Sequence, residues 1–156
     1  MAHLVRAGTS TQAVSDPVTA LIAACRHLGI KHLGLVSPYV APVSAKLRAV
    51  LEDAGINTPL FASFDEPLEA NVARIDEASV TEAAVSLGRD THCDAVFLSC
   101  TNLRTLSAIP QIEARIGKPV LSSNQVLIWH LCRLASVGLA SGFPGRLAST
   151  PTSQRK

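Results

Sequence analysis

This sequence has few aromatic residues and a small net charge. Each of these features limits the kinds of core or surface that the protein can have. Only 4% of the 156 residues are aromatic, so we expect a core built from alanine, valine, leucine and isoleucine. The formal net charge of +2 is too small to indicate a nucleic-acid-binding surface. With 47% hydrophobic and 17% charged residues, the composition is typical of one globular domain.

The sequence also shows no long apolar run, and we expect neither a secretory leader nor a cysteine pair of the CxxC type. No apolar run approaches the roughly 20 residues of a membrane-spanning helix. The opening MAHLVRAGTSTQ lacks an apolar leader core. The four cysteines, Cys25, Cys93, Cys100 and Cys132, show no CxxC spacing, which disfavours a zinc knuckle or a redox pair. We therefore expect a cytoplasmic protein with no membrane contact, no metal and no structural disulfide.

Short apolar segments alternate with helical patterns along the chain. The segments that read as strands are residues 32–36, 59–63, 95–99 and 119–122. Gly29, Gly55 and Gly117 are expected to end helices, and the capping box Ser79–Glu82 to begin one. This alternation predicts an α/β fold, with a parallel sheet of about four strands flanked by helices, flavodoxin-like.

The same patterns suggest three regions. Residues 1–15 form a polar N-terminal segment without a clear period, and residues 16–135 form the α/β domain. From Ser136 the chain becomes rich in Gly, Ser, Thr and Pro, so residues 136–156 are expected to form a disordered tail.

The stretch AVFLSCTNLRT, residues 95–105, is where we expect the chemistry. An apolar strand ends there in Cys100, Thr101 and Asn102. Ligands of open α/β sheets bind at the carboxyl ends of the strands. A helix is expected to begin just beyond, and its free N–H groups would favour an anion, either a bound carboxylate or the Cys100 thiolate.

Other polar residues follow the remaining strands. Tyr39 ends the turn Ser37-Pro38-Tyr39, where Pro38 is expected to stop the first strand. Tyr39 either faces the rim near Cys100 or simply packs its ring. Asn71 lies in a polar loop and either overhangs the rim or only forms a turn. The triplet His92-Cys93-Asp94 precedes its strand and is therefore expected to be structural, as is Cys25 on the apolar stripe of a helix.

Two long segments carry a family resemblance. LSCTNLRT and GKPVLSSNQVLIWHLCRLA resemble the second half of the maleate cis-trans isomerase family, within the aspartate/glutamate racemase superfamily. The turn VSPY and the loop EANVARID support the resemblance, which spans about Pro17 to Ala135. These segments resemble above all the ectoine-utilisation branch, and we expect arylmalonate decarboxylase to be a more distant relative.

The resemblance implies a cofactor-independent site between two similar α/β domains, each offering one cysteine. Cys100 matches the cysteine of the second domain. Tyr39 and Asn71 match residues that hold a substrate carboxylate, and Thr101 and Asn102 would supply backbone N–H donors and polar contacts. No metal is implied.

The family's first cysteine, in a Cys-Thr-Ser turn, has no counterpart here, so the sequence reads as a truncated member with one half-site. The expected function is maleate isomerase-like action on a small carboxylate or dicarboxylate through Cys100. The alternatives are a non-catalytic carboxylate-binding remnant or partner protein in ectoine degradation, and a decarboxylase-like enzyme with one cysteine. A homo-oligomer or a complementing domain is the expected partner.

Overall fold

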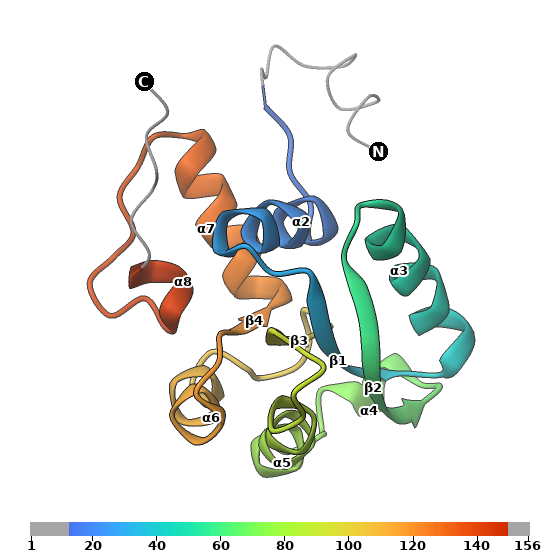
Figure 1. The fold of residues 1–156 in the computed structure, drawn as a ribbon. Coiled ribbons are helices and arrows are strands. Elements are labelled where there is room, and N and C mark those ends of the chain that lie inside the picture. The colour runs from blue at the N-terminus through green and yellow to red at the C-terminus, as the bar shows by residue number, and fades with distance from the viewer. Residues whose placement is uncertain (1–12, 150–156) are drawn as a thin grey trace.

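A four-stranded sheet forms the centre of the structure, a computed structural model that describes residues 13–149 (Figure 1). The strands are β1 (His32–Tyr39), β2 (Asn57–Glu66), β3 (Ala95–Leu98) and β4 (Val120–Ser122). Their order is β2-β1-β3-β4, and every neighbouring pair is parallel. The predicted α/β fold with a parallel four-stranded sheet is therefore confirmed.

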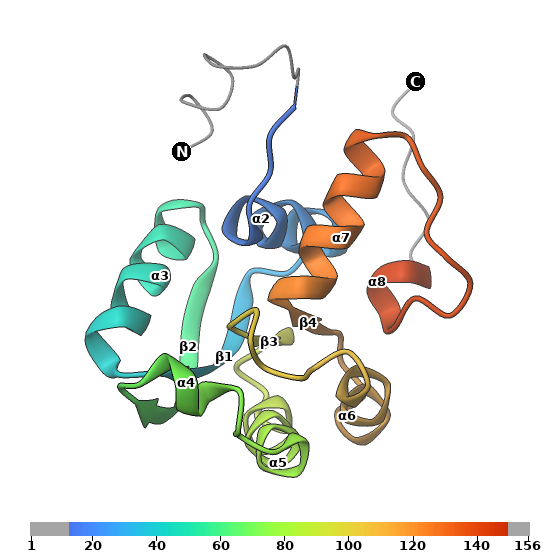
Figure 2. The same ribbon diagram turned by 180° about the vertical axis from the view of Figure 1, so that it is seen from behind.

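Helices cover both faces of this sheet, as Figures 1 and 2 show from opposite sides. One face carries α2 (Pro17–Leu28), α3 (Ala41–Asp53) and α7 (Ser123–Leu134). The other carries α5 (Glu77–Gly88) and α6 (Ala108–Ile116). Two short helices, α4 (Glu69–Val72) and α8 (Arg146–Ser149), complete the elements of residues 13–149.

Each face of the sheet has its own apolar core, because successive strand side chains point to opposite faces. Leu35 and Phe97 pack under α2 and α7, whereas Val36 and Leu98 pack against α5 and α6. All four residues of β3 are buried, as expected for a strand covered on both sides. This fully buried strand thus leads through Ser99 into Cys100.

Several element boundaries differ from the sequence prediction. β1 continues through Pro38 to Tyr39, and its register with β2 shifts there, which accommodates a residue without an N–H donor. α5 begins at Glu77, not at Ser79, because the Asp76 side chain caps it by accepting the Ser79 N–H. Gly29 and Gly117 end their helices as predicted, both with positive φ.

The segment after α7 departs from the predicted disordered tail. Leu147 in α8 is only 1% exposed and joins the core under α7. The buried Glu113 accepts the Arg146 N–H, and the Gln125 amide donates to the Pro144 carbonyl at 2.8 Å. Widely spaced contacts of this kind leave no periodic signal in a sequence. The remainder of the expected tail, residues 150–156, and residues 1–12 lie outside the described residues.

Within residues 13–149, none of the helices combines the length and the apolar character needed to cross a bilayer.

Candidate functional site

The carboxyl ends of β1 and β3 meet at the point where the chain changes direction across the sheet. These strands are neighbours, but the chain continues from β1 to β2 on one side and from β3 to β4 on the other. The segments that follow the two strands therefore diverge, and this is the position at which open α/β sheets bind their ligands. Tyr39 ends β1, and Cys100 follows β3 by two residues.

The Cys100 thiol lies against the Tyr39 hydroxyl, with Sγ and Oη 3.0 Å apart. The Asn102 backbone N–H also points at this sulfur, at 3.2 Å. Residues 61 positions apart thus form one contact, because Val36 of β1 lies in register with Leu98 of β3. Of the two alternatives left open for Tyr39, the hydroxyl reaches Cys100, and the ring also packs against the core.

Cys100 has a backbone φ of +130°, a conformation that residues other than glycine rarely adopt. The surrounding structure holds it there. Ser99 donates its N–H to the Val36 carbonyl at 2.9 Å, and Cys100 donates its own to Ser123 Oγ at 3.1 Å. Conformations of this kind persist where neighbouring contacts enforce them, and they cluster at functional sites.

Tyr39 remains protonated at neutral pH. Burial, the hydrogen bond with Cys100 and the nearby Cys100 and Glu69 charges all raise the pKa of the Tyr39 hydroxyl well above its usual value. The hydroxyl therefore keeps a proton that it can donate to an ionised sulfur at 3.0 Å.

The helix that supports Cys100 is not the one expected from the sequence. α6 begins only at Ala108, because residues 101–107 first form a loop that buries Leu103 beside Cys100 in the core. The helix end that contacts Cys100 belongs instead to α7, through Ser123. The N-terminus of a helix thus lies beside the Cys100 backbone, but this helix follows β4 and not β3.

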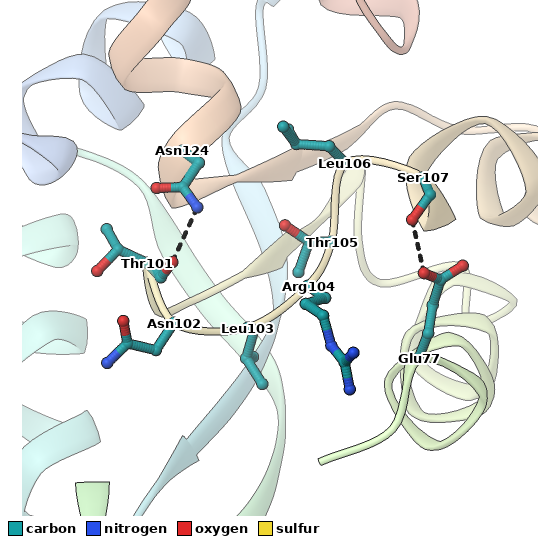
Figure 3. Close-up of a pocket in the computed structure, with 9 residues that line it drawn as sticks. All are labelled: Glu77, Thr101, Asn102, Leu103, Arg104, Thr105, Leu106, Ser107 and Asn124. Atoms are coloured by element: carbon teal, nitrogen blue, oxygen red, sulfur yellow. Dashed lines mark hydrogen bonds between the residues drawn. The ribbon is translucent and has the colours of Figure 1, made fainter. Parts of the chain in front are cut away.

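This loop, residues 101–107, borders a cavity of about 390 Å³ (Figure 3). Figure 3 shows the loop arching between Asn124 at the start of α7 and Glu77 at the start of α5. The Asn124 side chain donates to the Thr101 carbonyl at 2.9 Å. Thr101 and Asn102 line this cavity, whereas Tyr39, Asn71 and Cys100 are not among its lining residues.

Two glutamates that the sequence analysis did not consider lie among the predicted substrate-binding residues. The Asn71 side chain donates to Glu66 Oε1 at 3.2 Å, and the Asn102 side chain donates to Glu69 Oε1. Both glutamates belong to the segment DEPLEAN, which leads into Asn71. The sequence shows that both glutamates lie within five residues of Asn71. Only the fold brings Glu69 to Asn102.

The other cysteines lie away from this contact. Cys25 is fully buried in the core, and burial raises the pKa of its thiol to about 12. Cys93 precedes β3, at the opposite edge of the sheet, where Asp94 accepts the N–H groups of Lys31 and His32. These roles agree with the structural interpretation of Cys25 and of the His92-Cys93-Asp94 triplet.

No cluster of three or more His, Cys, Asp or Glu side chains suited to a metal ion occurs among residues 13–149.

Comparison with known proteins finds similarity to arylmalonate decarboxylases and to maleate isomerases. The sequence profile of the family described as arylmalonate decarboxylase matches residues 5–148. The arylmalonate decarboxylase of Bordetella bronchiseptica is 35% identical over 129 residues, which are 81% of this chain and 53% of that protein. The maleate isomerase of Geobacillus stearothermophilus is 28% identical over 145 residues, 92% of this chain and 57% of that protein.

Solved structures extend the comparison to the fold. The Nocardia farcinica maleate cis-trans isomerase, a cysteine-to-serine mutant with a covalently bound succinylcysteine intermediate, has a TM-score of 0.86 at 26% identity. That match covers 96% of this chain and 61% of the isomerase. A crystal structure of arylmalonate decarboxylase has a TM-score of 0.78 at 31% identity and covers 86% and 60% of the two chains. The chain spans about half the length of the curated relatives it matches.

Proposed function

This chain belongs to the arylmalonate decarboxylase family, and from that premise we propose that it acts on a small carboxylate through the Cys100 thiol, without a cofactor. The contact that carries the proposal is the 3.0 Å approach of Tyr39 Oη to Cys100 Sγ at the sheet's change of direction. A thiol with two aligned donors is equipped for proton transfer or for nucleophilic attack.

Proton transfer to carbon needs only one thiol. When a malonate-type substrate loses CO₂, the electrons of the broken C–C bond remain on the substrate as an enolate. The Cys100 S–H then gives its proton to that carbon and becomes a thiolate. The Tyr39 hydroxyl and the Asn102 N–H, 3.0 and 3.2 Å away, stabilise the negative sulfur.

Isomerisation of maleate is the second candidate, and the names of the relatives favour it. Here the Cys100 thiolate adds to one carbon of the double bond, and an acid protonates the other. The former double bond is now a single C–C bond and can rotate, after which loss of that proton and of the thiolate restores the double bond and gives fumarate. This route needs an acid on the face opposite Cys100, so the isolated chain is expected to isomerise maleate very slowly or not at all.

The substrate carboxylate would be held by Tyr39, Asn71 and Asn102, with Thr101 at the rim. Carboxamide and hydroxyl donors of this kind bind carboxylates without a metal. In the structure both carboxamides already bind carboxylate oxygens, those of Glu66 and Glu69, which supports this chemistry.

A second copy or a complementing domain would cover an exposed apolar stripe on α7. Ile128, Leu131 and Leu134 recur at helical spacing along α7, and each is more than 40% exposed. Such a stripe is typical of a face that another protein surface covers. If so, sedimentation of the purified chain should show association, and Leu131→Glu should weaken it; a monodisperse monomer would contradict this part of the proposal.

The central test combines turnover with binding. Purified chain would be incubated with maleate or with phenylmalonate, and products followed by proton NMR. We expect any turnover to disappear in Cys100→Ala and to persist in Cys132→Ala, which alters a cysteine on the outer part of α7. Turnover that survives Cys100→Ala would refute the assignment.

Binding is measured separately, through protection of Cys100 from iodoacetamide. Maleate or phenylmalonate should slow the labelling of Cys100 and leave that of Cys132 unchanged. Protection without turnover would favour the non-catalytic carboxylate-binding alternative. Failure of both carboxylates to protect Cys100 would overturn the proposed site.

All four cysteines are free thiols, which suits the reducing cytoplasm as the location.

A further inference from the structure

The predicted substrate-binding carboxamides already hold carboxylates that belong to the chain itself. Asn102 donates its side-chain amide to Glu69 Oε1, and Asn71 donates its side-chain amide to Glu66 Oε1 at 3.2 Å. Both glutamates come from one short segment, residues 66–69, which links β2 to α4 beside the sheet (Figure 2). Two independent amides thus select the same functional group.

Glu69 lies close to the reacting sulfur. Its partner Asn102 also directs its backbone N–H at Cys100 Sγ, at 3.2 Å. The Glu69 charge acts on Tyr39 as well, whose hydroxyl is 3.0 Å from the same sulfur. One carboxylate therefore faces both residues that surround the thiol.

We infer that Glu69 occupies the subsite of the substrate carboxylate and determines specificity by competing with it for Asn102. This inference rests on the proposed function for the identity of the substrate. A substrate carboxylate must displace Glu69 from Asn102 to bind there. A ligand without a carboxylate has no group that can replace Glu69 as the acceptor of the Asn102 amide. While Glu69 stays in place, its charge disfavours anions near Cys100.

The position of Glu69 is suited to displacement. Its side chain is exposed, and α4 is a single helical turn of four residues. Glu66, by contrast, also accepts the Leu68 N–H at 2.8 Å and so holds its own segment in place. Glu69 is therefore the carboxylate that leaves, and Glu66 the one that stays.

Two alkylating probes of similar size, one anionic and one neutral, test the inference. Iodoacetate carries a carboxylate and iodoacetamide is neutral, and both alkylate a thiolate with loss of iodide. Rate constants at Cys100 and at Cys132 would be measured by peptide mass spectrometry in the wild-type chain and in Glu69→Gln. The ratio of the two rate constants at one cysteine cancels any change in the ionisation of that thiol.

Glu69→Gln should raise the iodoacetate-to-iodoacetamide ratio at Cys100 about fivefold, the effect of one unit charge a few ångströms away in a water-like medium. The ratio at Cys132 should not change. Glu52→Gln removes the same charge from the last turn of α3, on a different element, and should leave both ratios at their wild-type values. A Cys100 ratio that stays unchanged in Glu69→Gln would overturn the inference.

A protection experiment separates this inference from the proposed function. The maleate concentration that halves the rate of iodoacetamide labelling at Cys100 should be lower in Glu69→Gln than in the wild-type chain. If maleate never protects Cys100 but the probe ratio still rises, the substrate assignment is wrong and the role of Glu69 stands. If maleate protects both variants equally, Glu69 does not compete and the inference fails. Glu69→Ala repeats both labelling experiments with the carboxylate side chain removed. Circular dichroism spectra of this variant and of the wild-type chain check that the variant is folded.

Discussion

Tyr39→Phe isolates the contact on which the site depends. The substitution removes only the hydroxyl that lies 3.0 Å from Cys100 Sγ and keeps the ring that packs against the α5 and α6 core. Of the two donors that the described residues direct at this sulfur, the Asn102 N–H at 3.2 Å would remain. The change therefore probes the thiolate and leaves the fold intact.

The size of the effect follows from the hydrogen bond that is lost. A hydrogen bond to a charged group contributes about 1.5–3 kcal/mol. Tyr39 is only partly buried, so water can replace some of this contribution, and the lower end of the range applies. At about 1.4 kcal/mol per factor of ten, thiolate formation becomes about tenfold less favourable.

Iodoacetamide labelling at neutral pH measures this directly, because the thiolate is the reacting species. We expect the Cys100 rate constant to fall about tenfold in Tyr39→Phe, with Cys132 as the internal standard. A thermal melt of both proteins checks that the fold persists. If Cys100 reacts at the wild-type rate or faster in a folded Tyr39→Phe protein, the hydroxyl does not stabilise the sulfur and the proposed role of Tyr39 is wrong.

Two further predictions concern stability. Gly145 and Gly142 both have positive φ, but a Cβ at Gly145 would come within 2.7–2.9 Å of side chains from α6 and α7, whereas one at Gly142 meets open space. In urea titrations we expect Gly145→Ala to cost about 1–3 kcal/mol more than Gly142→Ala, and equal costs would contradict the packing of this segment. Burial opposes ionisation of Asp94, but the N–H groups of Lys31 and His32 outweigh it and keep the Asp94 pKa below its usual value. The stability advantage of the wild type over Asp94→Asn should therefore be complete above about pH 5 and be lost as the pH falls below about 4, and a constant difference would refute this role.

The periodicity of the sequence determined the class of fold. Apolar segments as short as AVFL, bounded by polar residues, favour strands buried on both faces. Because helical patterns separate these segments along the chain, neighbouring strands are expected to be parallel. The change from the apolar run AVFL to the polar residues that follow it is likewise a local property of the sequence. These features depend on neighbours in sequence, which is why the sequence alone indicates them.

The site itself depends on contacts between distant segments, and only the tertiary structure decided these. The order β2-β1-β3-β4 sets Tyr39 beside Cys100, and because of the long loop 101–107 the helix that contacts Cys100 is α7, not α6. The same fold brings Glu69 to Asn102, 33 residues away, and buries Leu147 from a segment without any period. Side-chain periodicity reports which face of an element is buried, but it carries no information about which element lies opposite.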